Sequence, residues 1–274
     1  MVTVTPITPN VGAEVTDVDL TAVSDAQASA LRAGLIDRKA LVFRDQNIST
    51  KHFARFMSVF GETVKEDLVA DDGNPPEVGA IHIRPDEQQR INFWHMDHSF
   101  RENPSPVLAL HANILPPQGG DTLFTSLEAA YAGLSDRMKS QIEGLHALHK
   151  VTQTQNTKRR HTKEEIAALD QASTIRHPLV GLNKANGRKF LFVNIPIYCR
   201  SIAEMPTAEG DALLAKLYAH VQRPEFHFRL VWRPKTLIVW ENVHCLHYPV
   251  ADYFPHERKL WRVVIKGTER PIAA

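Results

Sequence analysis

Short runs rich in Val, Ile, Phe, Trp and Thr recur at uneven spacing along this chain. These residue types are enriched in β-strands. Helical patterns interrupt the runs but do not alternate with them one by one, as a parallel doubly wound sheet would require. We therefore predict a mainly β fold, a sandwich or barrel, with flanking helices. The strand-like runs cover 40–45, 107–115, 122–126, 189–194, 226–232, 236–240 and 260–266. Helical patterns begin at Ser24, Thr50, Ser135 and Thr162, and a further one covers 207–222.

The domain organisation is expected to be simple. No internal repeat, low-complexity tract or Ser/Gly-rich linker divides the 274 residues, and a domain boundary normally falls in such a linker. One domain over 1–274 is therefore expected. The polar segment 62–90 is expected to be a long loop that forms a lid, and the polar, basic segment 146–188 a solvated insertion.

Composition and charge exclude several classes of protein. At 43% hydrophobic and 23% charged residues, the chain has the composition of a folded globular protein. Lys and Arg number 32 against 31 Asp and Glu, whereas nucleic-acid or membrane-surface binding is accompanied by a basic excess. Two cysteines cannot form a disulfide framework, and neither a signal-peptide pattern nor a membrane-length apolar run is present. A cytoplasmic protein without nucleic-acid or membrane partners is expected.

A histidine and an aspartate two residues apart, His95 and Asp97, form the first candidate site. On a strand, residues i and i+2 project from the same face, so both side chains could bind one ion. A third ligand must come from far along the chain, and His244 and His247 follow the apolar run at 236–240. Two imidazoles and one carboxylate form the facial triad of non-heme iron oxygenases, which leaves open coordination positions.

Two arginines, Arg258 and Arg262, follow in a strand-like run, where they would share one face with Leu260. An unpaired buried guanidinium is very costly, so each arginine needs an anion. Bidentate pairing matches a guanidinium to a carboxylate or sulfonate. A Gly-Gly-Asp-Thr turn at 119–122 delivers the Thr122 hydroxyl to the start of a strand.

Five motifs in order along the chain carry a resemblance to a known family. They are FGE at 60–62, WHMDHSF at 94–100, GGDTLF at 119–124, LFVN at 191–194 and HYPVADYFPHERKLWR at 247–262. With these motifs the chain resembles the taurine dioxygenase family of Fe(II)- and 2-oxoglutarate-dependent oxygenases. The resemblance implies a double-stranded β-helix (jelly roll) core with helices outside and iron inside. It also implies oxidation of a small molecule by O2, with release of succinate and CO2, and self-association as a dimer or tetramer.

The resemblance assigns roles to particular residues. The implied metal ligands are His95, Asp97 and His247, because the family's third ligand precedes the cosubstrate arginine by eleven residues, a spacing that His244 lacks. The implied 2-oxoglutarate contacts are Thr122 and Arg258. Arg262 falls where family members commonly hold the acidic group of their substrate.

Departures from the taurine enzyme bear on the substrate. A gap-free alignment from FGE places Glu66 and Val69 where the taurine pocket supplies a His and a Tyr, and Ile91 where it supplies an Asn. A site deprived of its hydrogen-bonding groups discriminates strongly against the substrate they served, so taurine is expected to be a poor substrate. Glu66 would instead favour a substrate amine, so these residues leave open whether the substrate carries an amine.

The remaining pocket candidates are mostly apolar. With Arg262 fixing an acidic end, they favour an aryloxy or alkyl carboxylate, a sulfate ester or a larger sulfonate. The candidates are Ile91, Phe93, Tyr198 and Val69, with His98 as a further contact of opposite parity to the metal ligands.

Two other classes of protein could use the same residues. A zinc-dependent hydrolase could use the three ligands with Glu241 as general base, but this leaves Thr122 and Arg258 unexplained. A non-catalytic barrel that binds a small acid is the second alternative, and no feature of the sequence supports it.

Overall fold

Two β-sheets face each other at the centre of this computed structural model, which describes residues 1–65, 73–150, 174–196 and 198–274. Among these residues, the larger sheet has the strand order β1 (Thr3–Pro6), β2 (Ala13–Thr16), β3 (Ala40–Phe43), β13 (Leu237–Glu241), β5 (Val107–Ile114), β15 (Arg258–Val264) and β4 (Gly79–Ile83). The smaller sheet has the order β12 (His227–Leu230), β6 (Thr122–Ser126) and β14 (Cys245–Pro249). Apart from the parallel pair β2–β3, all pairs in both sheets are antiparallel.

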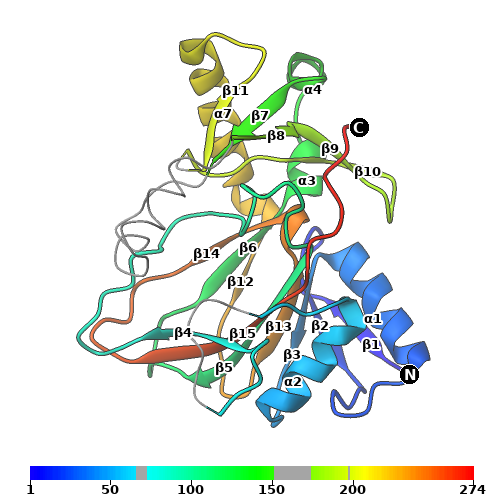
Figure 1. Cartoon of the computed structure of the whole chain (residues 1–274), viewed down its shortest axis with the longest axis vertical. Coiled ribbons are helices and arrows are strands. Elements are labelled where there is room, and N and C mark those ends of the chain that lie inside the picture. Colours follow the sequence, from blue (N-terminus) through cyan, green and yellow to red (C-terminus); the bar gives the residue numbers. More distant parts are fainter. Residues whose placement is uncertain (66–72, 151–173, 197) are drawn as a thin grey trace.

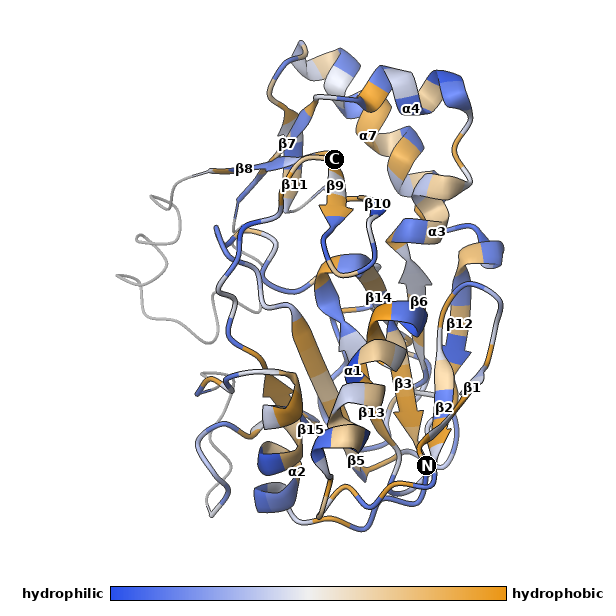
Figure 2. Cartoon of the chain, turned by 90° about the vertical axis from the view of Figure 1, so that its right-hand side faces the viewer, coloured by the Kyte–Doolittle hydropathy of each residue, from blue (hydrophilic) through white to orange (hydrophobic). Residues whose placement is uncertain are grey.

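Alternation along the strands separates two cores. On β13, Ile238 and Trp240 pack inward with Phe124 of the smaller sheet, while Leu237 and Val239 pack on the opposite face. Successive side chains of a strand point to opposite faces, and both faces of the larger sheet are covered near its centre, so every residue of β13 is buried. Figure 2 shows the apolar colouring of this part of the sheet. The same alternation in β15 places Arg258 and Arg262 on the inner face with Leu260, as predicted.

Two helices cover the outer face of the larger sheet (Figure 1). Helix α1 (Asp25–Arg38) begins at the capping box of Ser24 and Gln27, as the Ser24 pattern predicts. Helix α2 (Thr50–Met57) is capped by Ser49 and continues into the short η1 (Ser58–Phe60). Phe53 and Phe56 of α2 are buried against the sheet.

Further helices and two small sheets pack beyond the smaller sheet (Figure 1). The helices are α3 (Leu127–Ala132), α4 (Asp136–Ile142) and α7 (Thr207–Val221), with short turns η2 (Pro224–Phe226) and η3 (Asn242–His244). The sheets are β11 (Cys199–Ile202), β7 (His146–His149) and β8 (Ile175–Pro178), and the hairpin β9 (Val180–Asn183) with β10 (Arg188–Leu191). No helix in the described ranges is both long and apolar enough to cross a membrane.

The two segments expected to be irregular contain strands, which corrects that part of the prediction. Strand β4 lies within 62–90 and pairs with β15 at the edge of the larger sheet. Strands β7, β8 and β9 lie within 146–188. Their short apolar stretches are hidden among polar residues. Strands β4 and β7 form by pairing with β15 and β11, which lie far along the chain, whereas β9 forms a hairpin with β10. The described residues do not include 66–72 or 151–173, so the helix predicted at Thr162 lies outside them.

Two histidines, His149 and His177, are fully buried beside Phe192. Nδ1 of His149 lies 3.2 Å from the Ser99 hydroxyl, and Nε2 of His177 donates to the Arg101 carbonyl at 3.0 Å. Burial lowers the pKa of His149 to about 3 and the pKa of His177 to about 4. Both rings are therefore neutral in the folded protein at neutral pH.

The unfolded chain protonates these histidines near pH 6.5, so it binds more protons than the folded protein below that pH. Their contribution to stability is complete above pH 6.5 and is lost as the pH falls towards the folded pKa values. When the pH falls from 7.5 to 5, we expect each of the two histidines to lower the free energy of unfolding by roughly 2 kcal/mol. Urea unfolding at both pH values should therefore show that this fall in pH costs His149→Phe about 2 kcal/mol less of its free energy of unfolding than it costs the wild type. The exposed His256→Gln variant is the control; equal losses in the wild type and His149→Phe would contradict this assignment.

Candidate active site

Three side chains from two distant segments of the chain converge between the two central sheets. The donor atoms of His95, Asp97 and His247 all lie within 4.8 Å of one another. The backbones of His95 and His247 form an isolated antiparallel bridge with N···O distances of 2.9 and 2.8 Å, which brings the ring centroids to 4.1 Å. Nε2 of His95 lies 3.6 Å from Oδ1 of Asp97. The predicted triad is thus assembled, although 95–97 is held by this bridge and is not the regular strand that we expected.

The protonation states of the three groups suit a divalent metal ion. Nδ1 of His95 donates to the carbonyl of Phe93 at 3.0 Å, so the lone pair is on Nε2. Burial, together with the neighbouring His95, lowers the pKa of His247 to about 3 and keeps that ring neutral. Neutral imidazole and carboxylate are the forms that bind metals.

Arg262 lies against the aspartate of the triad. Its Nη2 donates to Oδ2 of Asp97 at 2.9 Å, and the arginine is almost completely buried. Burial alone would raise the pKa of Asp97, but the surrounding charges, Arg262 first among them, together outweigh burial and hold that pKa well below its usual range. The structure thus gives Arg262 a contact that the sequence did not predict, because its anionic partner is a triad residue.

Arg258 is a buried cation with unused hydrogen-bond donors. It is 2% exposed, and its Nε and Nη2 have no hydrogen-bond partner among the described residues. Its guanidinium lies over the rings of Trp232 and Tyr253, 5.8 and 5.7 Å from their centroids. Gly120 leaves room beside it, since a Cβ there would lie 3.1 Å from Arg258 Cδ and Nε. Burial lowers the pKa of Arg258, but a guanidinium stays charged at neutral pH, so this site fits an added carboxylate.

Thr122 is linked to this arginine through Trp232. The indole Nε1–H of Trp232 donates to the Thr122 hydroxyl at 3.1 Å, so the hydroxyl remains able to donate its own proton. Thr122 begins β6 and is 1% exposed. The sequence did not single out Trp232 or Tyr253, because only the folded chain brings them to Arg258.

The pocket candidates differ in where they lie. Phe93 packs edge-on against the His95 ring at 5.5 Å, and Tyr198 packs against Phe100 at 5.8 Å. Burial, and the charge of Asp97, raise the pKa of Tyr198 to about 12. Ile91 is 37% exposed. Glu66 and Val69 lie outside the described residues.

His98 is not one of the three converging ligand residues, and its backbone has a φ of 60°. Its Nδ1 lies 2.9 Å from the hydroxyl of Ser105, and burial lowers its pKa to about 3. The ring is therefore a buried neutral group with a protein partner already in place.

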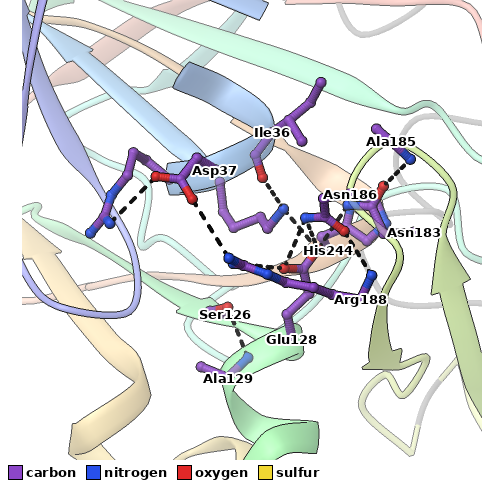
Figure 3. A network of polar contacts seen from close by, with 12 residues as sticks. Ile36, Asp37, Ser126, Glu128, Ala129, Asn183, Ala185, Asn186, Arg188 and His244 are labelled. Atoms are coloured by element: carbon purple, nitrogen blue, oxygen red, sulfur yellow. Dashed lines mark hydrogen bonds and ion pairs between the residues drawn. The ribbon is translucent and has the colours of Figure 1, made fainter. Parts of the chain in front are cut away.

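A cluster of charged side chains around Lys39 contains Glu241, the general base that the zinc-hydrolase alternative needs. The ammonium of Lys39 bonds Glu128 at 2.8 Å and Glu241 at 3.0 Å, and His244 lies 3.1 Å from Glu241. Figure 3 shows further polar side chains converging on Glu128, including Asn183, whose Nδ2 donates at 2.8 Å. Because Lys39 already supplies the cation of this cluster, Glu241 is occupied in an ion pair and is no free general base.

Comparison with known proteins agrees with this geometry. Residues 3–264 match the family described as "Taurine catabolism dioxygenase TauD, TfdA family". The chain belongs to this family. An alpha-ketoglutarate-dependent 2,4-dichlorophenoxyacetate dioxygenase of Cupriavidus pinatubonensis is 30% identical over 260 residues, covering 88% of this chain and 90% of the relative. An alpha-ketoglutarate-dependent sulfonate dioxygenase of Saccharomyces cerevisiae is 28% identical over 281 residues, 97% of this chain.

Coverage and structure complete the comparison. The chain spans about two thirds of the length of its yeast relatives, 66% for one from Schizosaccharomyces pombe and 67% for the one from S. cerevisiae. The crystal structure of AAD-2 in complex with Mn(II) and N-oxalylglycine has a TM-score of 0.83 and 25% identity, covering 99% of this chain and 100% of that one. The predicted jelly-roll fold and membership in a dioxygenase family are thereby confirmed.

Proposed function

We propose that this TauD/TfdA family member is an Fe(II)- and 2-oxoglutarate-dependent dioxygenase that hydroxylates a small organic substrate carrying an acidic group. The deciding observation is the combination of the His95, Asp97 and His247 triad with the buried Arg258, whose Nε and Nη2 have no hydrogen-bond partner among the described residues. Two imidazoles and one carboxylate suit Fe(II), and a buried guanidinium with unused donors suits the distal carboxylate of a keto diacid. The relatives' names support the same cosubstrate.

The chain's residues then divide the work. His95, Asp97 and His247 would hold Fe(II), while Arg258 and Thr122 would hold 2-oxoglutarate. When bound, iron and 2-oxoglutarate supply the oxidation of a C–H bond by O2, with release of succinate and CO2. Arg262 keeps Asp97 ionised through their 2.9 Å contact, so the triad carries its negative charge at every pH near neutrality.

The substrate class follows from the groups around the triad. Phe93 and Tyr198 offer aromatic surface near it, and Arg262 offers positive charge for an acidic end. We infer an aryloxy or alkyl carboxylate, a sulfate ester or a larger sulfonate, with taurine as a poor substrate. Hydroxylation next to a heteroatom would let the product collapse, and so cleave the substrate. Residues 1–274 would act as one domain in the cytoplasm, on a small anionic molecule.

A substrate screen tests this proposal. Succinate formation and O2 uptake would be measured with Fe(II) and 2-oxoglutarate across sulfonates, sulfate esters, aryloxy acids and amino-acid derivatives. We expect at least one apolar acid to be turned over at least about tenfold faster than taurine, since one lost polar contact discriminates by that much or more. Taurine turnover equal to that of the best acid would overturn the substrate class. No succinate with any candidate would count against the function itself.

A further inference from the structure

The segment that carries His95 and Asp97 runs outside the regular strands, yet its backbone is completely hydrogen-bonded. The N–H and C=O of His95 both pair with the backbone of His247. Beyond Asp97 the chain turns sharply at His98, whose φ is 60°, so no neighbouring strand continues the pairing. The polar backbone groups of Met96 and Asp97 are nonetheless paired, because unpaired buried backbone groups are costly.

Two buried asparagines supply these partners, one for each residue. Oδ1 of Asn194 accepts from the Met96 N–H at 3.2 Å, and its Nδ2 donates to the Met96 carbonyl at 2.9 Å. Oδ1 of Asn242 accepts from the Asp97 N–H at 3.1 Å, and its Nδ2 donates to the Asp97 carbonyl at 2.8 Å. Each side-chain amide thus replaces a peptide group of a missing strand, bonding both polar groups of one residue.

The asparagines are themselves fixed. Asn194 is 3% exposed, and its amide also bonds Ser99 Oγ at 2.7 Å and the Ile195 N–H at 2.8 Å. Asn242 is fully buried, and its Nδ2 also donates to the Ser105 carbonyl at 2.9 Å. Both amides therefore have little freedom to move, and they transmit that rigidity to the residues they bond.

We propose that Asn194 and Asn242 are positioning residues of the metal site, which hold the backbone of Met96 and Asp97 so that the Asp97 carboxylate faces His95 and His247. This inference rests on the proposed function, because it concerns the geometry of its metal ligands. Asp97 reaches the site from a segment that no regular strand stiffens, so the direction of its side chain depends on these amides. Groups that orient metal ligands typically change metal affinity by about 10- to 100-fold when removed.

A Co(II) titration of the metal-free protein, followed by visible absorption, tests the proposal without an activity assay. Asn194→Ala and Asn242→Ala should each weaken Co(II) binding by at least about tenfold and alter the absorption bands, which report coordination geometry. The matched control is Asn183→Ala, since Asn183 is a buried asparagine that bonds Glu128 and the Ala185 N–H. Asn183→Ala should lose comparable stability yet bind Co(II) within about twofold of the wild type.

Serine variants at the two positions cover the case in which an alanine variant does not fold. A serine hydroxyl can keep one of the two backbone bonds, so Asn194→Ser and Asn242→Ser should lie between wild type and alanine in Co(II) affinity. Folded variants at both positions with wild-type Co(II) affinity and absorption bands would overturn the inference and leave the proposed function intact. A wild-type protein that binds no Co(II) would instead overturn the proposed function, and this inference with it.

Discussion

His247→Ala is expected to abolish Fe(II)-dependent turnover of 2-oxoglutarate, a loss of at least about three orders of magnitude. The variant leaves His95 and Asp97 as the only triad ligands, and two ligands hold a metal ion weakly. The backbone bridge between residues 95 and 247 does not need the imidazole, so the fold should survive. Succinate formation and far-UV circular dichroism, measured on the same sample, would separate lost chemistry from lost structure.

The matched control for this prediction lies three residues earlier. His244 is a partly buried histidine, and its Nδ1 lies 3.1 Å from Glu241 in the Lys39 cluster. His244→Ala should therefore retain succinate formation within a few-fold of the wild type at a temperature where it is folded. Comparable losses in the two folded variants would contradict the assignment of His247 as the third ligand.

Arg258→Met is expected to weaken 2-oxoglutarate binding by roughly 150- to 5,000-fold, the 3–5 kcal/mol typical of removing one partner of a buried ion pair. Without cosubstrate, the same substitution should not lower the stability of the protein. The buried guanidinium then has donors with no partner, so a methionine of similar length should leave the thermal midpoint unchanged or raised. Calorimetric titration of the metal-loaded protein, and thermal unfolding with and without 2-oxoglutarate, would measure both effects.

An exposed arginine provides the comparison. Arg229 lies on β12 and pairs with Asp121 at 2.6 Å, with half of its side chain in solvent. Arg229→Met should bind 2-oxoglutarate within about threefold of the wild type, because exposed ion pairs contribute little. Wild-type affinity in Arg258→Met, or a marked loss of its stability without cosubstrate, would show that the guanidinium already has a protein partner.

The spacing of residues within single elements could be read from the sequence. Residues two apart on a strand share a face, so the pattern at 258–264 predicted that Arg258 and Arg262 point inward together, as they do in β15. The strand at 122–126 and the helix starts at Ser24 and Ser135 agree with the structure for the same local reason. Local periodicity and capping need only neighbouring residues.

Family resemblance added what local patterns could not. The separation of His247 from Arg258 by eleven residues, compared with the family's pattern, chose His247 over His244. Geometry agrees, because His247 joins the triad while His244 bonds Glu241. The strands β4 and β7, within 62–90 and 146–188, were missed because their short apolar stretches acquire strand structure from distant partners, β15 for β4 and β11 for β7.

The sequence by itself determined the residue types of the triad, their spacing, the inward face of β15 and the class of fold, because each depends on chain-local periodicity or on motifs shared with a family. Tertiary structure alone decided that Arg262 pairs with Asp97, that Trp232 joins Thr122 to Arg258, and that two asparagine amides hold Met96 and Asp97. The four hydrogen bonds join residues more than 90 positions apart along the chain. Only the contact between Trp232 and Arg258 is closer in sequence. Such pairings follow from how the elements pack and leave no periodic trace along the chain.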